Sequence, residues 1–206
     1  MLEFFIAALV IGIAPGPDNL FVLAQSATYG ARLGFCIILG LCTGIAIHTC
    51  LLVAGVSALI AASPTAFFVI QCLGAAYLLY LAYKSFGVKA GVVQMNGDYR
   101  SEPGMTSARS LYMRGIIMNL TNPKVILFVL SLIPPAVRLD RPIHPSLQMA
   151  IFGGEFILAT MIVFGSIALL AGAVKKFLLT SPKANRNLNW FSGAVFVFLA
   201  VALFFV

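Results

Sequence analysis

The feature that most constrains this chain is a long segment without any charged residue. Between Arg32 and Lys84 the sequence contains no Lys, Arg, Asp or Glu. A transmembrane helix needs about 20 predominantly apolar residues, so this segment is long enough for two of them. Only helices and closed barrels satisfy every backbone hydrogen bond in lipid, and apolar runs of this length favour helices. The segment therefore predicts an all-α integral membrane protein.

The composition of the whole chain supports this interpretation. The chain is 61% hydrophobic and 9% charged, whereas soluble domains are about 45–50% apolar and about 25% charged. These values exclude a soluble enzyme, a nucleic-acid-binding protein and a secreted disulfide-bonded domain. The N-terminal MLEFF has no basic region and no cleavage site, which favours a retained membrane segment over a cleaved signal peptide. The cysteines lie in apolar runs without CxxC spacing and are expected to be buried packing residues: Cys36, Cys42, Cys50 and Cys72.

Charged and turn residues divide the chain into six candidate transmembrane spans. These cover roughly 2–27, 33–60, 66–84, 111–134, 146–173 and 189–206. Residues 85–110 have no helical apolar stripe and are expected to form the one sizeable loop. The sequence therefore predicts a single transmembrane domain over residues 1–206, with six transmembrane helices.

Basic residues collect at alternate connections between these spans. The first, third and fifth connections with their flanks hold Arg32; Lys84, Lys89, Arg100, Arg109 and Arg114; and Lys175, Lys176, Lys183 and Arg186. The second and fourth connections hold only Arg138 and Arg141. Because Lys and Arg mark the cytoplasmic side of a membrane protein, we expect the odd connections in the cytoplasm and both termini on the outer side.

The six spans form two halves, about 2–84 and 111–206, which enter the membrane from opposite sides. This is the inverted-repeat arrangement of many secondary transporters. The first span of each half contains a proline break, at Ala14–Asp18 and at Asn122–Lys124. Interrupted helices at corresponding positions indicate a binding site near the membrane midplane. A pair of ordinary proline kinks is the alternative, since proline is tolerated in membrane helices.

Each break has the composition of a helix start. Proline favours the first position of a helix and Asn is a strong N-cap, so Asn122-Pro123 predicts a half-helix that begins there. Gly16-Pro17 predicts the same for the first half. The free N–H groups at such starts attract anions, including the carboxylate of a small substrate.

Both helix starts are followed by a charge. Asp18 lies at the favourable end of its helix dipole, whereas Lys124 lies at the unfavourable end and needs a nearby anion. The candidates are Asp18, Glu155 and a substrate carboxylate. We expect Asp18 and Lys124 to form an ion pair in at least one transport state, because a two-fold pseudo-axis brings the two helix starts together.

Two further polar residues lie inside the spans. Glu155 is near the centre of the fifth span, where a charge must face the bundle interior or water. It is a candidate for proton coupling, substrate-amine binding or pairing with Lys124, and a protonated structural Glu is the alternative. Gly40, Gly44 and His48 share one face of the second span, where GxxxG predicts close helix packing. His48 is a candidate proton carrier or a packing histidine.

The segments APGPDN and NPKVILF together resemble the LysE/RhtB superfamily of bacterial amino-acid exporters, most closely its RhtB branch. PGPDNLFVLAQSATYGARLGF, GLCTGIAIH, LGAAYLLYLAYK and MNLTNPKVILFVLSLIP stand in the order of that family, so the resemblance covers almost the whole chain. The positions that match its motif residues are Pro15, Pro17, Asp18, Asn19, Asn122, Pro123 and Lys124.

The resemblance implies export of a small amino acid such as threonine, homoserine or leucine across a bacterial inner membrane. It implies that the membrane potential or a proton gradient drives export. We expect no cofactor, no metal and no enzymatic activity. The direction of transport comes from the resemblance alone, and a homo-oligomer is left open.

Two alternatives are a divalent-metal exporter and an intramembrane enzyme that uses Asp18, His48 and Glu155 as acid–base groups. Neither has a supporting motif, because the sequence contains no HExxH and no ligand cluster.

Overall fold

The computed structural model of the chain describes residues 2–14, 16–62, 64–87, 107–138, 140–173, 182–202 and 204. Every regular element in this part of the chain is helical. The helices are α1 (Leu2–Ile13), α2 (Pro17–Tyr29), α3 (Ala31–Ala62), α4 (Pro64–Gly87), α5 (Ala108–Thr121), α6 (Pro123–Ala136), α7 (Pro145–Leu169) and α9 (Pro182–Ala202). The predicted loop at 85–110 lies largely outside the described residues.

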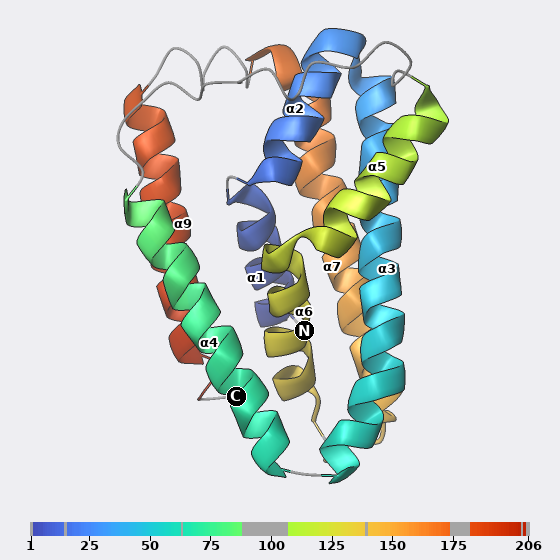
Figure 1. Cartoon of the computed structure of the whole chain (residues 1–206), viewed down its shortest axis with the longest axis vertical. Helices are drawn as coiled ribbons and strands as arrows, with labels where there is room; N and C mark the ends of the chain where they lie inside the picture. Colours follow the sequence, from blue (N-terminus) through green and yellow to red (C-terminus); the bar gives the residue numbers. More distant parts are fainter. Residues whose placement is uncertain are drawn as a thin grey trace.

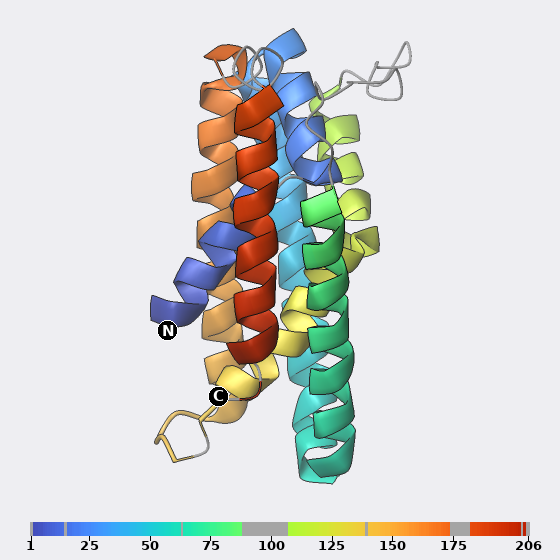
Figure 2. The same cartoon turned by 90° about the vertical axis from the view of Figure 1, so that its left-hand side faces the viewer.

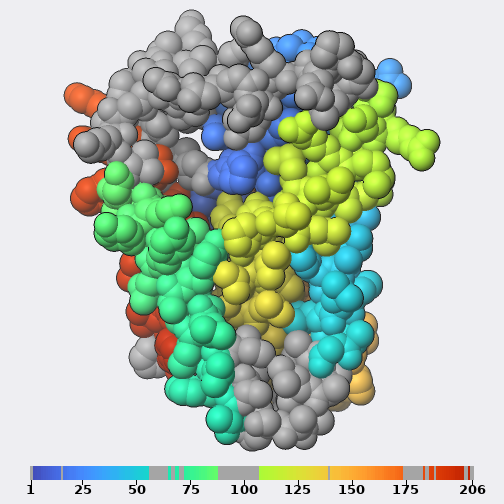
Figure 3. Space-filling view, in the orientation of Figure 1, coloured from blue at the N-terminus to red at the C-terminus, as the bar shows by residue number. Residues whose placement is uncertain are grey.

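The helices form an elongated bundle (Figure 1). The long helix α3 packs mainly against α5 and α7, and α1 also packs against α7. Helices α4 and α9 pack against each other and lie side by side at one edge of the bundle (Figures 1 and 2). On the face shown in Figure 3, α6 lies between α4 and the α3–α5 pair, and the surface is hollowed between α4 and α2.

Two pairs of helices are bent, at the two positions where the sequence predicts breaks. The bend is 63° between α1 and α2 and 58° between α5 and α6. Within the described residues, α7 and the Ala31–Gly55 part of α3 are each long and apolar enough to cross a membrane alone, and each bent pair can be one broken span. The protein is therefore a multi-pass helical membrane protein, and the six-span inverted repeat stays a prediction.

The turn between α2 and α3 depends on a glycine. Gly30 has a φ of +88°, a conformation that L side chains rarely adopt, and its N–H donates to the Ser26 carbonyl at 3.0 Å. In Figure 1 this turn lies at the same end of the bundle as the end of α4 and the starts of α5 and α9. The described helix ends that flank the odd-numbered connections therefore lie at one end of the bundle.

The predicted close packing at the glycine face of α3 is present. A Cβ added at Gly40 would collide with the Tyr112 carbonyl of α5, and one added at Gly115 would collide with the Ile37 carbonyl of α3. Such contact between backbones requires residues without side chains. The glycines thus allow α5 to lie directly on α3.

The outer surface carries many large apolar side chains, as expected of a surface that faces lipid. Leu51, Leu73 and Phe198 are each more than half exposed. This surface also corrects one prediction from the sequence. Cys42 is buried as expected, but Cys50 is exposed, because apolar residues in a membrane protein face lipid as well as the core.

Candidate functional site

The break between α1 and α2 leaves backbone carbonyls without their usual partners. A helical carbonyl accepts from the N–H four residues later, and the residue four after Ile11 is a proline, which has no N–H. Lys124 takes its place, because its Nζ donates to the Ile11 and Ala14 carbonyls at 3.2 and 3.1 Å. Asn19 Nδ2 donates to the Gly12 carbonyl at 2.7 Å. Three backbone carbonyls at this break thus accept hydrogen bonds from side chains.

The position of Lys124 explains how an ammonium is tolerated at the start of α6. The carbonyls at the C-terminal end of α1 carry partial negative charge, which favours a cation there. Gly16 leaves room for this arrangement, since a Cβ at that position would lie 3.2 Å from Lys124 Nζ. In this conformation the carbonyl dipoles at the end of α1, and not an anion bonded to Lys124, stabilise its ammonium.

Asn122 joins the two breaks. Its Oδ1 accepts from the backbone N–H of Lys124 at 3.0 Å, so it caps α6 as the sequence predicts. Its Nδ2 donates to Asp18 Oδ2 at 2.7 Å, across 104 positions of the chain. Asn122 and Asp18 are each 4% exposed. A hydrogen bond to a buried carboxylate thus connects the first turn of α2 with the cap of α6.

Asp18 and Lys124 lie at the same site but do not form a direct ion pair among the described contacts. Asp18 bonds to Asn122, whereas Lys124 bonds to carbonyls of α1. The direct pair expected from the sequence is therefore absent from this conformation. It stays a prediction for another transport state.

The two charges line one small cavity, whose interior of about 20 Å³ has room for a water molecule. Small-molecule sites have mostly apolar walls with a few polar groups, as this cavity does, but they commonly have about 300–1,000 Å³, so a bound substrate requires a wider conformation than this one. The polar side chains in this wall are Asp18, Lys124, Asn119 and Thr160. The remaining wall is formed by Ile11, Gly12, Leu41, Ile45, Val125, Phe156 and Phe164.

The structure brings some of the predicted site residues together and leaves others apart. Asp18, Asn19, Asn122 and Lys124 meet at the breaks, and Pro17 and Pro123 begin α2 and α6. Pro15 lies outside the described residues.

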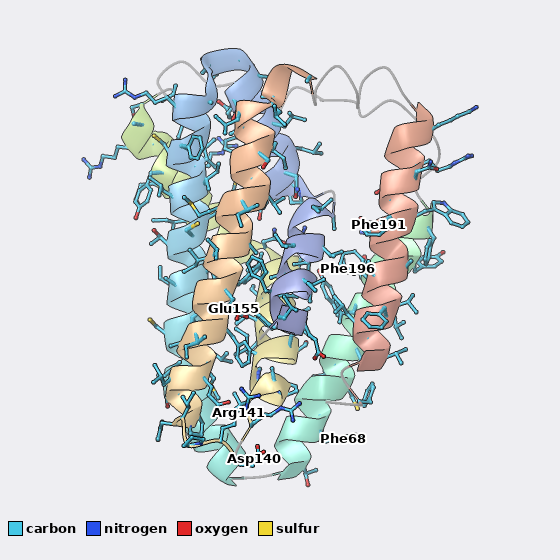
Figure 4. All side chains as sticks on the ribbon, turned by 180° about the vertical axis from the view of Figure 1, so that it is seen from behind. Phe68, Asp140, Arg141, Glu155, Phe191 and Phe196 are labelled. Carbon is cyan, nitrogen blue, oxygen red and sulfur yellow. The ribbon has the colours of Figure 1, made fainter. Side chains whose placement is uncertain are left out.

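His48 and Glu155 do not line the cavity. His48 Nε2 lies 3.4 Å from the backbone carbonyl of Asn119, at the edge of hydrogen-bond distance. Glu155 is half-buried on the part of α7 beside α1 (Figure 4), and its Oε2 has no hydrogen-bond partner among the described residues. The neighbouring Phe156 faces the cavity instead. No three His, Cys, Asp or Glu side chains of the described residues come together as metal ligands.

Two polar residues of the wall were missed by the sequence reasoning. Asn119 is 2% exposed and Thr160 is 4% exposed. Asn119 precedes Asn122 by one helical turn, so a search for polar residues one turn from the break finds it. Thr160 has no comparable signal, because its place in the wall depends on how α7 is rotated against α3 and α6.

Comparisons with known proteins agree with these observations. Residues 9–205 match the family described as "LysE type translocator". The chain is 31% identical over 197 residues to "Uncharacterized membrane protein YrhP" of Bacillus subtilis (strain 168), with 93% of this chain and 91% of that protein covered. It is 30% identical over 201 residues to "Homoserine/homoserine lactone efflux protein" of Salmonella typhi, with 97% and 93% covered.

A third relative is an "Uncharacterized membrane protein" of Vibrio cholerae serotype O1, which is 29% identical over 196 residues, with 95% of this chain and 92% of that protein covered. No solved structure matches the chain significantly. The family match spans both helix breaks and the whole cavity wall. The chain therefore belongs to the LysE type translocator family.

Proposed function

We propose that this protein is a secondary transporter that exports small neutral L-amino acids of the threonine, homoserine or leucine type across the bacterial cytoplasmic membrane. The observation that carries the proposal is the presence of one carboxyl and one ammonium, Asp18 and Lys124, in the wall of a single cavity. An α-amino acid carries the opposite two charges on one carbon. A wider form of this cavity, in another transport state, can therefore bind both ends of the zwitterionic group through charge-assisted hydrogen bonds.

The hydrogen bonds at the site leave one group free for each end of this substrate. Lys124 has three N–H donors and gives two of them to the Ile11 and Ala14 carbonyls, so one remains for a substrate carboxylate. Asp18 Oδ2 is held by Asn122, whereas its Oδ1 is buried without a partner among the described residues. Oδ1 is the acceptor for the substrate ammonium.

The arrangement of the breaks supports a transport mechanism of the alternating-access type. In this proposal the two bent pairs are the first spans of two inverted three-helix repeats, and rocking of one repeat against the other exposes the site to each side in turn. The name of the Salmonella typhi relative, an efflux protein for homoserine and homoserine lactone, supports the outward direction and the substrate class.

The orientation in this proposal places the basic end of the bundle in the cytoplasm. In a variant without the native cysteines, single cysteines in place of Ser107 or Lys183 are expected to be shielded from an impermeant thiol reagent in intact cells. A cysteine in place of Asp140, which is exposed at the opposite end, is expected to react. Labelling at position 107 or 183 from outside, with position 140 protected, would reverse the orientation.

Counterflow in proteoliposomes tests the function directly. Vesicles loaded with one unlabelled amino acid should take up labelled threonine, homoserine or leucine, and the Lys124→Met protein should not. Basic and acidic amino acids serve as the comparison set, because a further charge in the largely apolar wall is costly. Absence of uptake for the whole neutral set would refute the proposal.

A further inference from the structure

One polar group in the cavity wall is not used by the zwitterionic part of the proposed substrate. Asn119 is 2% exposed, and its Oδ1 is buried without a hydrogen-bond partner among the described residues. Its side chain lines the same cavity as Asp18 and Lys124. A buried amide oxygen without a partner is costly, so its retention in an otherwise largely apolar wall points to a ligand group that completes it.

The surrounding helices hold this amide in place. A Cβ added at Gly44 would lie 2.6 Å from Asn119 Oδ1 and 2.7 Å from Asn119 Cβ, so only glycine leaves room for the side chain. The backbone carbonyl of Asn119 lacks its usual helical donor because residue 123 is proline. It accepts instead from the N–H of Asn122 at 3.1 Å and lies 3.4 Å from His48 Nε2.

The face of α3 that carries Gly44 and His48 therefore positions Asn119 in addition to allowing close helix packing. Gly44 makes space for the Asn119 side chain, and His48 lies against its backbone. The two residues are one turn apart on α3 and both contact the last turn of α5. Gly44 and His48 are therefore positioning residues, because they hold the Asn119 amide in place.

We propose that Asn119 determines specificity by forming a hydrogen bond with a hydroxyl on the substrate side chain. This inference rests on the proposed function, in which Asp18 and Lys124 bind the ammonium and the carboxylate. The transporter then favours threonine over valine and homoserine over norvaline, since each pair differs by a hydroxyl in place of a methyl group. A neutral hydrogen bond of this kind corresponds to roughly a tenfold difference in apparent affinity.

The test is the ratio of apparent affinities within each pair, measured by competition in proteoliposome counterflow. We expect a ratio of about ten for the wild type and a ratio near one for Asn119→Leu and Asn119→Ala, which remove the amide. Ser131→Ala is the matched control, because Ser131 is also buried with an unpartnered oxygen but does not line the cavity. It is expected to keep the wild-type ratio.

The outcomes separate this inference from the proposed function. A wild-type protein that transports both members of each pair equally well, or an Asn119→Leu protein that keeps the wild-type ratio, overturns the role of Asn119 and leaves the transport proposal standing. Absence of all amino-acid transport in the wild type overturns both. If a variant folds but does not transport, the ratio of affinities is obtained from the increase in melting temperature that each amino acid causes in detergent. A ligand that binds only the native state raises its stability.

Discussion

The two helix breaks have similar bends but opposite chemistry. The α1–α2 break, bent by 63°, presents backbone carbonyls and the Asp18 carboxyl, and no side chain caps the start of α2 at Gly16. The α5–α6 break, bent by 58°, presents the Asn122 amide and the Lys124 ammonium, and Asn122 caps α6 itself. In the hydrogen bonds between the two breaks, the first break supplies the acceptors and the second supplies the donors.

This difference shows that each break is incomplete alone. Asn122 and Lys124 of the second break donate to Asp18, Ile11 and Ala14 of the first. Two breaks of the same chemistry would leave either carbonyls or donors unsatisfied in the membrane, where no bulk water replaces the missing partner. The two breaks therefore form one structural unit.

The largest effect is expected for Lys124→Met. The variant removes the only side chain seen to bond the Ile11 and Ala14 carbonyls in the described structure, and it removes the proposed ligand of the substrate carboxylate. We expect transport below about 1% of wild type, since a site that lacks one ligand charge loses roughly a hundredfold or more. The melting temperature in detergent should also fall. Normal counterflow by a well-folded Lys124→Met protein would contradict the role of this residue.

A smaller and purely functional effect is expected for Glu155→Gln. Glu155 lies outside both breaks and does not line the cavity, so its neutral isostere should keep expression and melting temperature close to wild type. If Glu155 carries the coupling proton, proton-driven transport should fall severalfold or more, whereas exchange without a proton gradient should persist. If the variant and the wild type show equal rates of proton-driven transport, Glu155 does not carry the coupling proton and has only a structural role.

The smallest expected effect is a difference in the stability lost when each of two helix caps is removed. Asn122 caps α6 and bonds to Asp18 inside the bundle, whereas Ser107 caps α5 at the exposed end, where its Oγ accepts from the Ser110 N–H at 3.1 Å. We expect Asn122→Ala to lower the free energy of unfolding by about 1–2 kcal/mol and Ser107→Ala by about 0.5 kcal/mol. Denaturant unfolding in the same detergent compares them. Equal losses would mean that the link between the breaks adds no stability.

The sequence predicts the breaks and their caps well, because proline and Asn act through local chemistry. Pro17 and Pro123 begin helices for the same reason in any fold. The glycine face at Gly40 is likewise visible as a spacing. These features need no knowledge of what the segment packs against.

The partners across the site could not be predicted in the same way. The ligands of Lys124 are the Ile11 and Ala14 carbonyls, which are backbone groups present at every position and leave no side-chain pattern. Glu155 and Phe156 are neighbours in the chain, yet only Phe156 lines the cavity. Which of the two does so depends on the rotation of α7 against α3 and α6, and this rotation is set by the packing of the whole bundle.

The most direct test of the central claim is a double-mutant cycle between the breaks. Asp18→Ala, Asn122→Ala and the double variant are compared by the free energy of unfolding in detergent, with Asp18→Ala and Ser107→Ala as the control cycle. The hydrogen bond between Asp18 Oδ2 and Asn122 Nδ2, at 2.7 Å, predicts a coupling energy of about 1–2 kcal/mol in the first cycle and additivity within about 0.5 kcal/mol in the control. Additivity in both cycles would contradict the account, because the two breaks would then be independent kinks.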